Sequence, residues 1–174
     1  MEKSLIIGIF FSLLCSVLVN GAFQLQNVVC ESLDLSISEF NRCEMKIVQR
    51  GVSAFYMIWK WYKKPINNID VNLSFHKRSN GYLPFLFNQT LDYCYYMRNP
   101  KAHPLIYTMH KTFWPASNIN HSCPYDQDMI INGFIFNKND LMDLPISNGD
   151  YMIQVKIATD KNYNACIKIY TKKM

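Results

Sequence analysis

Few residues of the chain have types and spacings that could do chemistry. His121-Ser122-Cys123 has the residue types of a zinc site, but a lone His-x-Cys without a second pair rarely binds the metal. Asp126 and Asp128 could act as paired carboxylates, although two acids that follow a proline are more typical of a solvated turn. We therefore expect no metal site.

The remaining candidates for catalysis are equally scattered. His103 and His110 are seven residues apart and would share one face of a helix, where we interpret them as surface histidines. The chain contains no G-x-S-x-G motif, and its six glycines form no phosphate-binding loop. The sequence therefore predicts neither an enzyme nor a cofactor.

The first residues have the pattern of a secretory signal peptide. Lys3 precedes an apolar stretch from Leu5 to Val19, and small residues follow at Gly21 and Ala22. A membrane anchor needs about 18 to 20 apolar residues, and this stretch has 15. We predict a signal peptide over 1–21 and one secreted, extracellular domain over 22–174.

Secretion predicts that cysteines form disulfides, because the compartment is oxidising. Cys15 is lost with the signal peptide, and five cysteines remain, so one is left over. We expect this one to be Cys166, because in its predicted strand it faces away from Ile167 and Ile169. The spacing does not choose among the pairings of the other four.

Modification sites and charge agree with an extracellular protein. Three glycosylation sequons begin at Asn72, Asn88 and Asn120. The net charge of +5 is spread along the chain, without the dense basic stripe of a nucleic-acid groove, so we expect no nucleic-acid partner. A mild attraction to anionic membrane surfaces fits this charge.

Alternation of apolar and polar residues predicts several half-buried strands. They cover residues 42–48, 55–61, 69–76, 129–136, 151–157 and 165–171, with turns at 80–81, 148–150 and 160–164. Pro104 to Trp114 has helical spacing. These elements predict an all-β antiparallel sandwich with one short helical insertion.

Large apolar side chains dominate the inward faces of these strands. They are Phe55, Met57, Trp59, Trp61, Val71, Leu73, Phe75, Phe85 and Phe87. Either they fill the core between two sheets, or the sheets separate and the same side chains line a cavity for an apolar ligand. The pattern leaves both readings open.

One block of the sequence carries a family resemblance. Ser117 to Tyr125 reads SNINHSCPY, and it follows KRSNGYLPFLFN at 77–88 and LDYC at 91–94. Together with the start of the predicted domain, FQLQNVVC, these motifs resemble a large insect family of secreted proteins that carries a domain-of-unknown-function label. That family is grouped with the myeloid-differentiation-related lipid-recognition (ML) superfamily, and the chemosensory B proteins are its best known relatives.

The resemblance implies an immunoglobulin-like β-sandwich that holds a lipid or another small apolar molecule between its sheets. It also implies that Cys30, Cys43, Cys94 and Cys123 form the disulfide framework. The leading hypothesis is therefore a secreted lipid-binding protein, with chemosensation as one role. The alternative is an extracellular interaction module with a filled core, acting on a receptor, at a membrane surface or as a dimer through Cys166.

Overall fold

The computed structural model describes residues 23–136 and 146–174, so the predicted signal peptide lies outside the described part. The strands are β1 (Phe23–Ser32), β2 (Ser38–Gln49), β3 (Val52–Trp61), β4 (Asp70–Ser79), β5 (Gly81–Asp92), β6 (Met129–Ile135), β7 (Gly149–Thr159) and β8 (Asn162–Lys173). Between β5 and β6 lie the helices α2 (Tyr93–Tyr96), η1 (Pro100–Ala102), α3 (Pro104–His110) and η2 (Lys111–Ala116).

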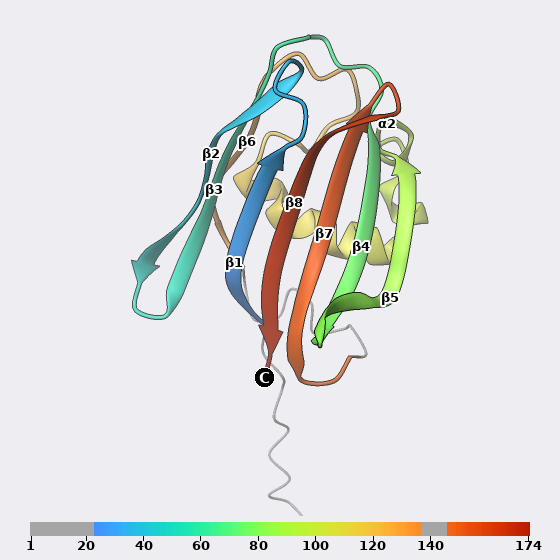
Figure 1. The fold of residues 1–174 in the computed structure, drawn as a ribbon. Helices are drawn as coiled ribbons and strands as arrows, with labels where there is room; N and C mark the ends of the chain where they lie inside the picture. Colours follow the sequence, from blue (N-terminus) through green and yellow to red (C-terminus); the bar gives the residue numbers. More distant parts are fainter. Residues whose placement is uncertain (1–22, 137–145) are drawn as a thin grey trace, which may run out of the picture.

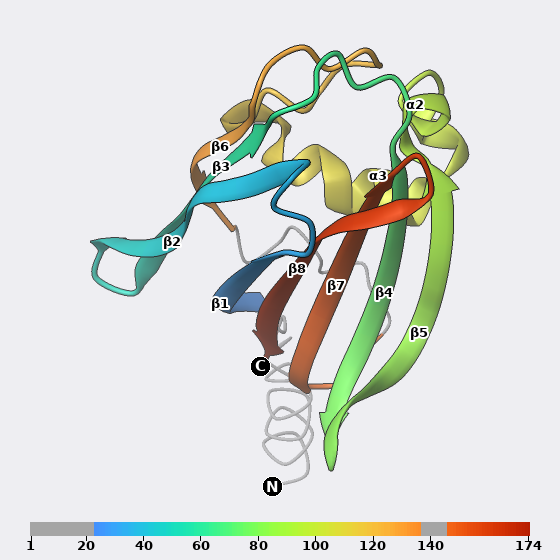
Figure 2. The same cartoon turned by 45° about the horizontal axis from the view of Figure 1, so that its top comes forward.

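The strands form two antiparallel sheets of unequal width. The wider sheet has the order β1-β8-β7-β4-β5, and the narrower sheet has the order β2-β3-β6. Figure 1 shows the narrower sheet beside the β1 edge of the wider one, and Figure 2 shows the two sheets diverging. This arrangement confirms the predicted all-β antiparallel sandwich.

The difference in width explains the position of the helical insertion. Adjacent strands are about 4.8 Å apart, so three strands leave roughly 10 Å of a five-stranded face uncovered. A helix is about 10 Å across. In both views the helical segment spans from the β6 side to the β5 side and occupies this uncovered space. The insertion therefore acts as a further wall of the sandwich.

Local sequence accounts for most element boundaries. The hairpin between β7 and β8 turns at Asp160 and Lys161, which both have positive φ, as a two-residue type I′ turn requires. The predicted helix 104–114 begins at Pro104 as expected, but the α-helix ends at His110 and continues as a 3₁₀ turn that contains Pro115. A proline inside a helix removes a backbone donor, which fits this change.

One disulfide joins the two sheets, and the other joins the two ends of the segment between β5 and β6. Cys30 in β1 is bonded to Cys43 in β2, which joins the two sheets. Cys94 in α2 is bonded to Cys123 in the segment before β6. Cys166 is free, as predicted, and it is 3% exposed, so its thiol is not on the surface.

Candidate ligand-binding cavity

A cavity of about 210 Å³ lies between the two sheets and the helical segment. Five of the predicted ligand-binding residues line it: Phe55, Met57, Trp59, Val71 and Leu73. The first three lie in β3 and the other two lie in β4, so opposite walls are built from the alternation read in the sequence. Such a cavity is what the resemblance implied.

The other four predicted residues do not line the cavity. Phe75 is fully buried, with its ring 5.9 Å from that of Phe87, 6.3 Å from that of Phe85 and 5.3 Å from that of Tyr151. Trp61 is 3% exposed, and its ring packs at 4.2 Å from that of Trp59. These residues fill solid parts of the core at either side of the cavity, so the core is filled in part and hollow in part.

Further lining residues come from strands that were predicted correctly and from the helix. In β7 and β8 they are Ile153, Val155, Ile157, Ile167, Ile169 and Thr171. Alternation had marked the inward face of these strands, but only the packing of the sheets places that face on the hollow part of the core. Ile106, Met109 and Phe113 come from the helical segment.

His110 is the main correction to the sequence interpretation. It is 6% exposed and lines the cavity, whereas we had expected a surface histidine. Its Nε2 lies 3.0 Å from the Tyr93 hydroxyl and its Nδ1 lies 3.1 Å from the Tyr96 hydroxyl. The helix turns this side chain inward because the insertion packs against the sandwich through the same face.

The hydrogen bonds around His110 define its tautomer. The Tyr93 hydroxyl donates its proton to the Ile119 carbonyl at 2.9 Å, so at His110 it can only accept, and Nε2 carries the hydrogen. Nδ1 then accepts from the Tyr96 hydroxyl. Burial lowers the pKa of His110 to about 4 and raises the pKa of Tyr93 well above its usual value. At neutral pH this cluster is uncharged and its polar atoms are paired.

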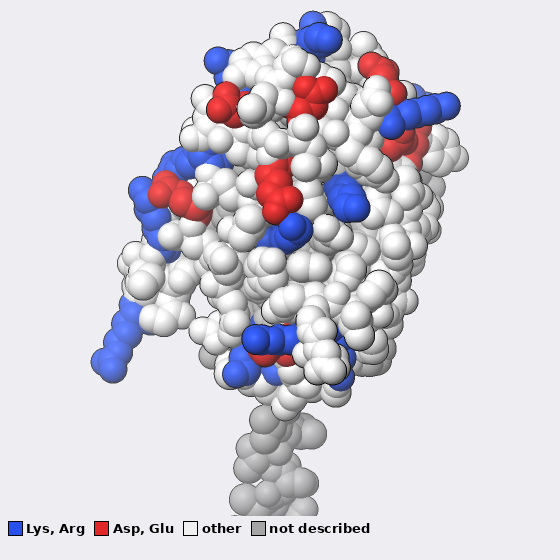
Figure 3. Space-filling view, viewed as in Figure 1, with Lys and Arg blue, Asp and Glu red and all other residues white. Residues whose placement is uncertain are grey.

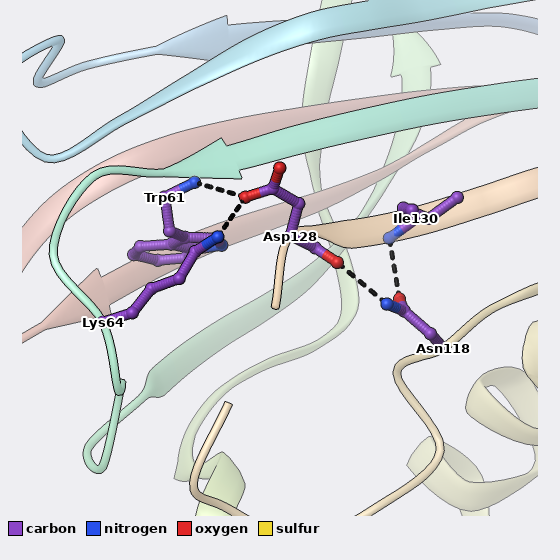
Figure 4. Close-up of polar contacts among 5 residues, drawn as sticks. All are labelled: Trp61, Lys64, Asn118, Asp128 and Ile130. Atoms are coloured by element: carbon purple, nitrogen blue, oxygen red, sulfur yellow. Dashed lines mark hydrogen bonds and ion pairs between the residues drawn. The ribbon is translucent and has the colours of Figure 1, made fainter. Parts of the chain in front are cut away.

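A polar clamp connects the C-terminal end of β3 with the start of β6 (Figure 4). Asp128 accepts from the backbone N–H of Trp61 at 3.3 Å and from the Lys64 ammonium. The Lys64 bond lowers the pKa of Asp128. Asn118 donates to the Asp128 carbonyl at 2.8 Å and accepts from the Ile130 N–H at 2.7 Å. Asp128, which we had interpreted as part of a solvated turn, instead joins the ends of β3 and β6.

The clamp shows a structural role for the SNINHSCP block, which is the most specific part of the family resemblance. Asn118 belongs to the SNINHSCP block and bonds at the start of β6. The next residue, Ile119, lines the cavity, and its carbonyl accepts from Tyr93. The block therefore contributes one side chain to the cavity wall and one carbonyl acceptor to the His110 cluster.

Two of the three predicted glycosylation sites lie opposite each other on the outer face of the wider sheet. Asn72 pairs with Thr90 and Ser74 pairs with Asn88 across β4 and β5. The Asn72 amide donates to both Asn88 and Thr90 at 2.9 Å. Asn120 is exposed in the segment before β6. None of the three lines the cavity.

The surface has no concentrated charge on the face shown in Figure 3, where basic and acidic groups are interspersed. Residues 23–136 and 146–174 contain no group of three or more histidine, cysteine or acidic residues arranged to hold a metal ion. Within the same described ranges, no helix has the length and apolar character needed to cross a membrane.

Part of the chain matches a known protein family. No curated protein matches the chain. Residues 71–153, which run from β4 to the start of β7 and include the helical insertion and the SNINHSCP block, match the family described as "Protein of unknown function (DUF1091)".

Proposed function

We propose that the chain is a secreted, non-enzymatic binding protein that holds a lipid or another small apolar molecule between its two sheets. The observation that carries this proposal is the cavity of about 210 Å³, whose walls are apolar side chains from both sheets and from the helical segment. Ligand pockets are mostly apolar with a few fixed polar groups, and the His110 cluster provides such groups here.

The size of the cavity limits the ligand. It exceeds the ~150 Å³ of an engineered cavity that binds benzene. It is smaller than the ~300 Å³ at the lower end of drug-sized sites. A ligand that buries about 300 Å² of apolar surface would gain roughly 7 kcal/mol before ordering costs. We therefore expect dissociation constants in the micromolar range or weaker.

Secretion forms part of the same proposal. Two disulfides are typical of proteins that fold in an oxidising compartment. The three sequons fit the same route. A role in chemosensation rests only on the family resemblance of the sequence.

Tryptophan fluorescence tests the binding, because Trp59 lines the cavity. The matched pair of variants is Val155→Phe in the cavity wall and Val48→Phe at the exposed end of β2. Val155 packs against both apolar clusters of the core, so four added carbon atoms occupy the middle of the cavity.

We expect medium-chain lipids to change the emission of the wild type and of Val48→Phe at micromolar concentrations, and to bind Val155→Phe at least tenfold more weakly. Circular dichroism checks that all three proteins fold. If folded wild type responds to no member of a panel of alcohols, esters, fatty acids, hydrocarbons and sterols, the binding proposal is wrong and the interaction-module hypothesis replaces it. Native mass spectrometry of the secreted protein would report a co-purified lipid directly.

A further inference from the structure

The part of the cavity wall that the structure describes carries no charge that could neutralise an ionised ligand. Among the described residues that line it there is no lysine, arginine, aspartate or glutamate. His110 is neutral at pH 7, and both of its nitrogens are engaged by tyrosine hydroxyls. A carboxylate that entered fully would lose its hydration without gaining a counter-charge, which is strongly unfavourable.

Among the described residues that line the cavity, every side-chain hydroxyl except one has a hydrogen-bond partner. Tyr93 donates to the Ile119 carbonyl, Tyr96 bonds His110, and Thr112 donates to the Met109 carbonyl at 2.8 Å. Thr171 is 1% exposed, and its Oγ1 has no hydrogen-bond partner. A buried hydroxyl without a partner destabilises the fold. An oxygen atom of a bound molecule would remove this cost.

Thr171 lies in the part of the cavity wall that β8 provides. It shares the inward face of β8 with Ile167 and Ile169, and all three line the cavity. Its neighbours across the sheet are Leu25 in β1 and Tyr151 in β7. Thr171 therefore provides a hydroxyl in the β8 part of the wall, where the other lining residues are apolar.

A second unpartnered group lies in the cavity wall. The Trp59 indole N–H is also buried without a partner, and Trp59 lines the cavity. The lining extends from Thr171 in β8 to Ile157 in β7, which lies opposite Ala165, so it covers six strand positions or about 20 Å. An indole N–H only donates, whereas a hydroxyl both donates and accepts, so Thr171 is the better partner for an alcohol.

We propose that the cavity selects an uncharged, elongated lipid with a single hydroxyl or carbonyl oxygen, and that the Thr171 hydroxyl binds this oxygen. The inference deepens the proposed function and rests on it. It assigns the chemical class of the ligand, because the apolar walls accept a hydrocarbon chain, the absence of a cation disfavours a carboxylate, and Thr171 provides the polar contact.

Three ligands of equal chain length test the assignment: decane, 1-decanol and decanoate. The binding of each is measured by displacement of the uncharged fluorophore N-phenyl-1-naphthylamine from the secreted protein at pH 7.4. We expect wild type to bind 1-decanol at least tenfold more tightly than decanoate and about fivefold more tightly than decane. Thr171→Val has the same shape without the hydroxyl, so it should bind 1-decanol about fivefold more weakly and decane as before. Thr171→Ser keeps the hydroxyl and should keep the preference for the alcohol.

The outcomes separate this inference from the proposed function. If decanoate binds wild type as tightly as 1-decanol, or if Thr171→Val keeps the wild-type preference for the alcohol over decane, the assignment is wrong while the binding function stands. If folded wild type binds neither the fluorophore nor any of the three ligands, the proposed function itself fails. Should Thr171→Val not fold, the wild-type ratios and Thr171→Ser still decide the matter.

Discussion

The buried His110 predicts that acid destabilises the protein before its carboxylates are protonated. Burial lowers the folded-state pKa of His110 to about 4 from an ordinary value of 6.5. The folded state therefore favours the neutral imidazole. The resulting stability is complete above pH 6.5 and is lost as the pH falls from 6.5 to 4.

The size of the effect follows from the shift. A difference of about 2.5 pKa units corresponds to roughly 3 kcal/mol once the pH is below both values. Between pH 7 and pH 5 we expect a loss of about 2 kcal/mol. The structural reason is that Nδ1 would have to carry a proton while it faces the Tyr96 hydroxyl in an apolar wall.

Urea unfolding followed by circular dichroism at pH 7, 6 and 5 measures this loss. His110→Gln provides a donor and an acceptor without a titrating group, so its free energy of unfolding should fall by about 2 kcal/mol less than that of wild type over this range. His121→Gln, at an exposed position, should follow wild type. Parallel curves for wild type and His110→Gln would refute the reasoning, because contributions from other groups, including His76, are common to both proteins.

Two further predictions concern the supports of the cavity. Asp128→Asn keeps an acceptor for the Trp61 N–H but loses the ion pair with Lys64, so it should reduce the free energy of unfolding by about 0.5–1 kcal/mol at pH 7. This difference should vanish as the pH falls below 3.8, the ordinary pKa of an aspartate. The ion pair lowers the pKa of Asp128 in the folded state, so its contribution to stability is lost as the carboxylate is protonated. A difference between the two proteins that persists at pH 2 would contradict the assignment. Replacing Cys94 and Cys123 together by alanine opens a loop of about 30 residues and should cost about 3–4 kcal/mol in thermal or urea unfolding, and an unchanged unfolding midpoint would show that the disulfide adds no stability.

The sequence was most informative about the strands. Alternation identified the inward faces of β3, β4, β7 and β8, because one face of each strand packs on the core and the other meets solvent. The odd number of cysteines also led to a free Cys166, and parity placed it on the outer face. β1 was not predicted, since the apolar residues of Phe23–Ser32 follow no regular alternation and Asn27 falls at a shift in its register with β8.

What the sequence could not decide is where the core is hollow. Phe75 and Leu73 follow the same alternation in one strand, yet Phe75 packs among aromatic rings while Leu73 faces the cavity. His110 likewise reads as a surface residue until the helix is placed across the uncovered part of the wider sheet. Local periodicity depends on neighbours within one element, whereas a cavity depends on the distance between elements far apart in the chain. Inward direction was therefore encoded in the sequence pattern, but the space that the inward side chains leave was decided by tertiary packing alone.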